Sequence, residues 1–112
     1  METTRQQRIA RLLQKELAGI FQRDTQALGH GVLVSVTNVR ISPDLSVARV
    51  YLSIFPSEKG EEILENIRAT APSVRYKLGN IVRHQLRIIP ELNFFLDDSL
   101  DYIDHIDELL KQ

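Results

Sequence analysis

The sequence predicts an α+β fold, a two-layer sandwich in which helices cover one face of a three-stranded sheet. Two observations lead to this prediction. Apolar residues recur at helical spacing in four segments, and they alternate or form β-branched runs in three short ones. The expected order is helix, strand, strand, helix, helix, strand and an extra C-terminal helix. Helices on one side of so small a sheet give two layers.

Residues 3–26 are expected to form one amphipathic helix that stops near Gly29 and Gly31, which allow backbone turns that other residues resist. Its apolar residues at helical spacing are Ile9, Leu12, Leu13, Leu17, Ile20 and Phe21. Basic residues lie together on the opposite side, at Arg8, Arg11 and Lys15.

A hairpin follows this helix. Residues 32–41 are short and rich in β-branched residues, which predicts a strand, and Pro43 followed by Asp44 predicts a turn. Residues 47–55 alternate strictly, so they form the second strand. Its predicted inner face is Ala48, Val50, Leu52 and Ile54.

Two helices are predicted to meet at Pro72, because a proline restricts the residue before it and cannot donate to a helical ladder. Ser57 is expected to cap the first helix. The second is expected to run from about residue 73 to 86, and Gly79 inside it predicts close packing against a neighbour. Its expected apolar stripe is Val74, Leu78, Ile81, Val82 and Leu86.

Residues 91–97 alternate again and predict the third strand, with Phe95 on the outer face. Asp98 or Ser99 would then cap the C-terminal helix. We expect Phe95 to pack against that helix rather than stack on a base. The inward residues of the helix would be Leu100, Ile103, Ile106, Leu109 and Leu110.

The composition favours one domain spanning residues 1–112, since a chain of this length has little room for a second core. The chain has no cysteine, which excludes disulfides and thiolate metal sites. Its first residues lack the apolar core of a signal peptide, and no stretch approaches the roughly 18 apolar residues of a membrane span. We therefore expect a cytoplasmic monomer.

Charge is sharply segregated although the formal net charge is only −1. Residues 66–90 contain five Lys or Arg and no acid, a local charge of +5, whereas residues 91–112 contain one Lys and seven acids, so 1 − 7 = −6. Such segregation indicates two faces with different partners, or two solvated faces that attract each other.

Catalysis is poorly supported. Asp97 and Asp98 are adjacent, so their side chains diverge and a turn or cap role is favoured over a shared proton. The three histidines, His30, His84 and His105, show no metal-ligand spacing. Because no Gly-rich phosphate loop or nucleophile motif is present, we expect no enzyme, cofactor, metal or small-molecule substrate.

The second middle helix is expected to carry a basic face suited to RNA. At about 100° per residue, the side away from its apolar stripe holds Tyr76, Lys77, Asn80, Arg83, His84 and Arg87. Cations there could neutralise phosphates and Tyr76 could stack on a base, or the face could simply be solvated. Arg75 could contact RNA or pair with an acid of the preceding helix, and the basic stripe of the first helix could bind RNA or only keep it soluble.

The element order, with its proline-marked junction, resembles the type II KH fold. The stretch VRYKLGNIVRHQLRIIPELNFFLDDSL, residues 74–100, resembles the signature of the ribosome-binding factor A family, and RQQRIARLLQKELAGIF and VRISPDLSVARVYLS resemble its earlier elements. The resemblance covers nearly the whole chain. Two signatures depart from it: the Gly-x-x-Gly loop of ordinary KH domains is absent, and Thr70-Ala71-Pro72 stands where the family has Ala-x-Gly.

The resemblance implies a non-enzymatic assembly factor that binds the small (30S) ribosomal subunit and its 16S rRNA late in maturation, with roles in rRNA processing and growth in the cold. The alternative from another class is a protein-interaction or dimerisation module with a KH-like fold. The RNA-binding residues expected from the charge pattern and the resemblance are Arg8, Arg11, Lys15, Arg75, Tyr76, Lys77, Arg83, His84 and Arg87.

Overall fold

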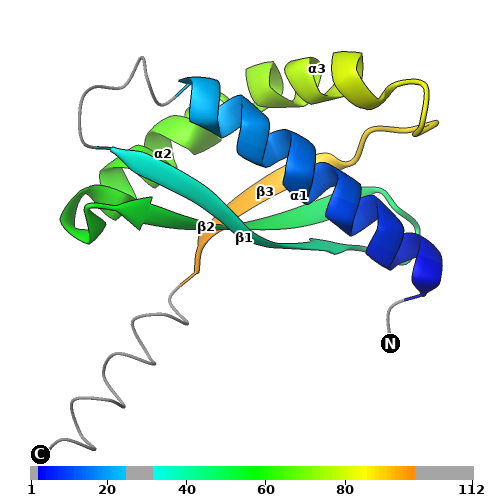
Figure 1. The fold of residues 1–112 in the computed structure, drawn as a ribbon, viewed down its shortest axis with the longest axis horizontal. Coiled ribbons are helices and arrows are strands. Elements are labelled where there is room, and N and C mark those ends of the chain that lie inside the picture. The colour runs from blue at the N-terminus through cyan, green and yellow to red at the C-terminus, as the bar shows by residue number, and fades with distance from the viewer. Residues whose placement is uncertain (1–2, 25–31, 98–112) are drawn as a thin grey trace, which may run out of the picture.

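A computed structural model describes residues 3–24 and 32–97 (Figure 1). The elements are α1 (Thr4–Asp24), β1 (Leu33–Ile41), β2 (Val47–Phe55), the short 3₁₀ helix η2 (Ser57–Lys59), α2 (Gly60–Ala69), α3 (Ala71–Val82) and β3 (Glu91–Leu96). The predicted order of helix, strand, strand, helix, helix and strand is confirmed. The predicted C-terminal helix lies outside the described residues. None of the described helices combines the length and the apolar character that crossing a membrane requires.

The sheet has the order β1-β2-β3, with β1 antiparallel and β3 parallel to β2. Figure 1 shows the three α-helices on one side of it. The predicted alternation of β2 is confirmed, because Ala48, Val50 and Leu52 are fully buried while Arg49 between them is exposed. In β3, Leu92 and Phe94 face the same core. The other face of the sheet carries the intervening side chains and is covered by no described helix.

Side-chain hydrogen bonds cap the start of α1 and join this helix to β1. Thr3 and Gln6 form a capping box: the Thr3 backbone N–H donates to Gln6 Oε1 at 2.8 Å, and the Gln6 backbone N–H donates to Thr3 Oγ1 at 3.1 Å. Gln6 is buried and its amide donates to the Ile41 carbonyl oxygen at 2.9 Å. Gln14 donates to the Val36 carbonyl oxygen at 3.2 Å. These bonds hold the apolar side of α1 on the sheet and leave its basic side outward.

The junction between α2 and α3 lies where Pro72 predicts it, with Thr70 as the single residue between the helices. The predicted cap at Ser57 is wrong, because Ser57 begins η2 and no side chain caps the start of α2. The predicted bounds of α3 are also wrong. The helix starts at Ala71 and ends at Val82, four residues before the expected end.

Two further details of α3 differ from the prediction. Ile81, expected in the buried stripe, is 38% exposed, whereas Leu78 and Val82 are fully buried. Gly79 does face a neighbour, but a Cβ there would lie 3.5 Å from Ile89 Cγ1, an ordinary contact. The buried stripe of α3 is therefore narrower than predicted, and its packing does not require glycine.

Candidate nucleic-acid interface

The outer face of α3 carries only part of the predicted basic surface. Tyr76 is 71% exposed, and Lys77 beside it is exposed. Because the helix ends at Val82, Arg83 is its C-cap, His84 follows in a turn, and Arg87 lies in a bend further along. Placing these three on the helix face was wrong. All three are exposed, in the segment 83–90 that joins α3 to β3, which we call the basic connection.

Arg75 makes two hydrogen bonds that the sequence did not predict. Its Nε donates to the Pro90 carbonyl oxygen at 3.2 Å, and its Nη2 donates to the Ile89 carbonyl oxygen at 2.7 Å. The predicted ion pair with an acid of α2 is not formed. Arg75 therefore holds the end of the basic connection against α3, and two of its donors are used in doing so.

Arg68, at the end of α2, forms hydrogen bonds to β3. Its Nε and Nη2 donate to the Phe94 carbonyl oxygen at 3.1 and 2.8 Å, and its Nη1 pairs with Glu65 at 2.9 Å. The amides of Glu91 and Asp97 donate toward β2, so the alternation of the strand turns the Phe94 carbonyl to the free edge. Arg68 thereby satisfies an acceptor on an edge strand, where unpaired backbone groups would otherwise invite another chain.

Phe95 packs on the open face of the sheet. Its ring centroid is 5.7 Å from that of Tyr51, and the Arg68 guanidinium lies 5.9 Å from the ring centroid. The C-terminal helix that we expected to cover Phe95 lies outside the described residues. Phe95 is 37% exposed.

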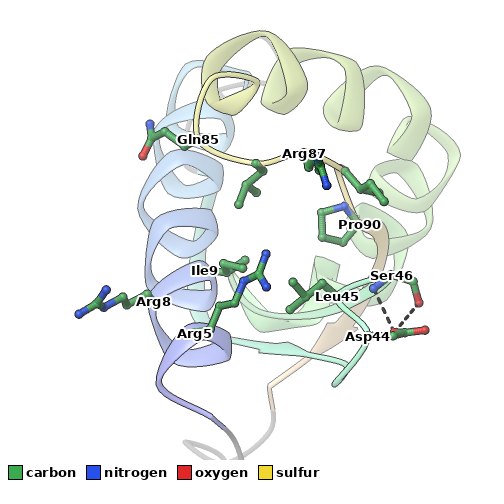
Figure 2. A pocket seen from close by; sticks show the side chains of 11 residues that line it. Arg5, Arg8, Ile9, Asp44, Leu45, Ser46, Gln85, Arg87 and Pro90 are labelled. Atoms are coloured by element: carbon green, nitrogen blue, oxygen red, sulfur yellow. Dashed lines mark hydrogen bonds between the residues drawn. The ribbon is translucent and has the colours of Figure 1, made fainter.

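The basic stripe of α1 and the basic connection meet at one hollow. Arg8, Arg11 and Lys15 are exposed on α1, and Arg8 lines a hollow of about 490 Å³ together with Arg87. We call it the arginine hollow; its lining residues are Arg5, Arg8, Ile9, Asp44, Leu45, Ser46, Gln85, Leu86, Arg87, Ile88 and Pro90 (Figure 2).

Arg5 was missing from the residues expected from the sequence. It precedes Arg8 by three positions, so extending the basic stripe by one helical turn would have included it. The capping box places it in the first turn of α1. Within residues 3–24 and 32–97, no side-chain hydrogen bond or ion pair involves Arg5, Arg8, Arg83 or Arg87. Their charge is therefore directed to solvent, unlike that of Arg68 and Arg75.

Two of the described acids, Asp97 and Asp44, accept hydrogen bonds within the protein. Asp97 accepts a hydrogen bond from the Thr37 hydroxyl of β1 rather than forming a turn or a cap, while Asp98 lies outside the described residues. Hydrogen bonds from the Ser46 and Ser42 hydroxyls lower the pKa of Asp44. No three of the described His, Asp and Glu side chains are grouped closely enough to hold a metal ion. His30 and His105 fall outside the part of the chain that the structure describes.

Known protein sequences are similar to this chain over nearly its whole length. The family described as Ribosome-binding factor A matches residues 5–110 of the chain. Proteins of that name from Cytophaga hutchinsonii and Flavobacterium johnsoniae are 47% and 48% identical to it. These two alignments cover 100% and 98% of this chain, and 84% and 85% of the relatives.

Solved structures show the same fold. The crystal structure of ribosome-binding factor A from Thermus thermophilus matches with a TM-score of 0.63 and 28% identity, over 81% of this chain and 94% of that chain. A homology model of the Thermus thermophilus factor, fitted into the cryo-EM map of its 30S complex, matches with a TM-score of 0.63 and 30% identity. That match covers 78% of this chain and 89% of the other. The predicted KH-like two-layer fold is confirmed.

Proposed function

The chain belongs to the ribosome-binding factor A family, and on this premise we propose that it binds the small ribosomal subunit through 16S rRNA while that subunit matures. It acts by binding rather than by catalysis. We further propose that it works late in assembly, assists 16S rRNA processing and supports growth in the cold. It does so as a single KH-like domain, a monomer in the cytoplasm.

One observation carries the proposal: cations from two distant segments share one surface. Arg5 and Arg8 come from the start of α1, Arg87 comes from the basic connection, and all three line the arginine hollow. Arginine side chains that make no bond within the described protein can neutralise phosphates and release the counterions of folded RNA. Guanidinium groups also suit phosphate because they offer two parallel donors.

We propose that two areas flank the hollow on this surface. The outer side of α1 extends it through Arg11 and Lys15, and the outer side of α3 adds Tyr76 and Lys77, where the exposed Tyr76 ring provides a platform for an unpaired base. The proposed contacts to RNA are Arg5, Arg8, Arg11, Lys15, Tyr76, Lys77, Arg83, His84 and Arg87. Arg75 is proposed as a positioning residue whose remaining donors can reach a phosphate.

Sedimentation tests the proposed function. The purified chain is mixed with isolated small subunits, or with translating ribosomes, and each mixture is run through a density gradient at low and at raised salt. We expect the chain to travel with free small subunits, to be absent from translating ribosomes, and to dissociate as salt rises. Sedimentation at the top of every gradient, or binding that raised salt leaves unchanged, would contradict the proposal.

The open face of the sheet favours a second candidate, a protein-interaction module. Leu33 and Phe55 are cross-strand partners on that face and are 58% and 66% exposed. Two large apolar side chains exposed side by side are typical of a protein contact. The same gradients separate the candidates, because a chain that sediments as a light complex of fixed stoichiometry, without subunits, would support this second function instead.

A further inference from the structure

The arginine hollow is assembled from three parts of the chain: the first turns of α1, the turn at Asp44–Ser46 and the basic connection. Its volume of about 490 Å³ lies within the roughly 300–1,000 Å³ typical of small-ligand sites. A hollow of this size can take one compact chemical group but not a nucleic-acid duplex.

Two guanidinium groups reach into this space. Figure 2 shows Arg5 and Arg87 extending into the arginine hollow from opposite sides, whereas Arg8 and Gln85 point away from it. Two like charges directed into one space repel each other unless an anion lies between them. The anion that arginine pairs favour geometrically is a carboxylate or a phosphate.

The rest of the lining is largely apolar. Ile9, Leu45 and Pro90 face into the hollow (Figure 2), and Ile88, another lining residue, is 69% exposed. Leu45 is held in a left-handed backbone conformation, with φ of 64°. Pro90 is fully buried and Ile9 nearly so, so the apolar surface open to water is that of Leu45 and Ile88. A small free anion would leave that surface in water. A ligand that joins an anion to a flat, weakly polar body would cover it.

One carboxylate also lies on the rim. Asp44 Oδ1 accepts hydrogen bonds from the Ser42 hydroxyl at 2.8 Å, the Ser46 hydroxyl at 2.7 Å and the Ser46 backbone N–H at 3.1 Å. Figure 2 shows the carboxylate turned away from the centre of the hollow. With Arg5, Arg8 and Arg87, the rim therefore carries a formal charge of 3 − 1 = +2, which still favours an anionic ligand.

We propose that the arginine hollow takes one unstacked nucleotide of the ribosomal RNA. Its phosphate lies between Arg5 and Arg87, and its base covers Leu45 and Ile88. This inference rests on the proposed function and adds the mode of recognition. Proteins that read single-stranded RNA take bases out of the stack and place them on apolar, aromatic or guanidinium surfaces. An acidic protein side chain would supply the charge but not the flat body.

A methyl NMR titration tests this assignment on the full chain. Adenosine monophosphate is added to protein labelled at Ile and Leu methyl groups, and inorganic phosphate is added to a second sample. We expect adenosine monophosphate to shift the methyl signals of Ile9, Leu45 and Ile88 in a saturable way, while inorganic phosphate leaves the base-covered methyls of Leu45 and Ile88 nearly unshifted.

Variants identify the groups that hold the phosphate. Arg5→Gln and Arg87→Gln should each weaken adenosine monophosphate about tenfold, the value of one charge-assisted contact. Arg23→Gln, at the other end of α1 and outside the hollow, should leave the affinity unchanged. The methyl spectrum of each variant shows directly whether it is folded.

The outcomes separate the inference from the proposed function. Equal shifts with phosphate and with the nucleotide, or unchanged affinity in both hollow variants, would overturn the nucleotide assignment. If no nucleotide binds while the chain sediments with small subunits, this inference fails and the proposed function stands. If the nucleotide binds but no subunit does, the proposed function and the assignment to ribosomal RNA are both overturned.

Discussion

Arginine side chains have different roles in the two halves of the basic segment, residues 66–90. In the first half, Arg68 and Arg75 donate to carbonyl oxygens of Phe94, Ile89 and Pro90. In the second half, past the end of α3, Arg83 and Arg87 make no side-chain bond within the described residues. The first half joins the helices to β3 and to the end of the basic connection, and the second presents charge outward.

The difference shows that a count of basic residues overstates a binding surface. Five cations without an acid indicate a face for a partner or a solvated face, yet Arg68 satisfies the edge of the sheet and Arg75 anchors the basic connection. A hydrogen bond with a charged donor contributes about 1.5–3 kcal/mol when it is shielded from water. That is enough to commit an arginine to the fold, so Arg68 has a structural role and Arg75 a positioning role.

Charge reversal in the outward half should produce the largest effect. Arg83→Glu with Arg87→Glu is expected to weaken binding to the small subunit about a hundredfold, from two contacts of about 1.5 kcal/mol each. The slope of log affinity against log salt should fall by about 2. Both quantities come from sedimentation or fluorescence titration over a salt series, and thermal unfolding should be unchanged.

A matched pair provides the control for net charge. Arg23→Glu with Lys59→Glu makes the same change in charge at the end of α1 and in η2, outside the proposed surface. Its affinity should stay within about threefold of the parent chain, because the Debye length near 10 Å screens distant exposed charges. Equal losses in the two double variants would show that only total charge matters.

Removing Arg68, which bonds to β3, should have a smaller effect, on the free energy of unfolding rather than on binding. Arg68→Ala is expected to lower the free energy of unfolding by about 1 kcal/mol, below the usual range because its side chain is 43% exposed. Urea unfolding measures this loss. Glu65→Ala removes only the exposed ion pair and should cost less than about 0.5 kcal/mol. If Arg68→Ala weakened subunit binding and left stability intact, the two halves would not differ as described.

The smallest expected effect is that of changing Asp44, whose carboxylate lies on the rim of the arginine hollow. Hydrogen bonds from Ser46 and Ser42 lower its pKa in the folded chain. Its contribution to stability is therefore complete above the unfolded-state pKa of about 4 and is lost as pH falls through the lower folded value. Asp44→Asn should make unfolding slightly easier near neutral pH, and the difference should vanish once the pH falls below the folded pKa of Asp44. Urea midpoints across a pH series measure this, and a parallel offset at every pH would contradict it.

The interface could be predicted from the sequence only in part. Arg8 and Arg87 were expected to bind RNA, and both line the arginine hollow. Arg5 was missed, although one more helical turn would have included it. Arg75 was left between an RNA contact and an ion pair with α2, and that ion pair is not formed, because its partners are carbonyls 14 and 15 residues away. Nothing in local spacing indicates such a partner.

The order of the described elements, the inner faces of β2 and β3, the Pro72 junction and the family all followed from the amino-acid sequence. These features are local: side chains repeat every two residues in a strand and about every 3.6 in a helix, so the pattern alone identifies the buried face. The early end of α3, the exposure of Ile81, the carbonyl partners of Arg68 and Arg75, and the hollow between α1 and the basic connection were decided by tertiary structure. Each depends on groups far apart in the chain, whose meeting is set by packing and not by periodicity.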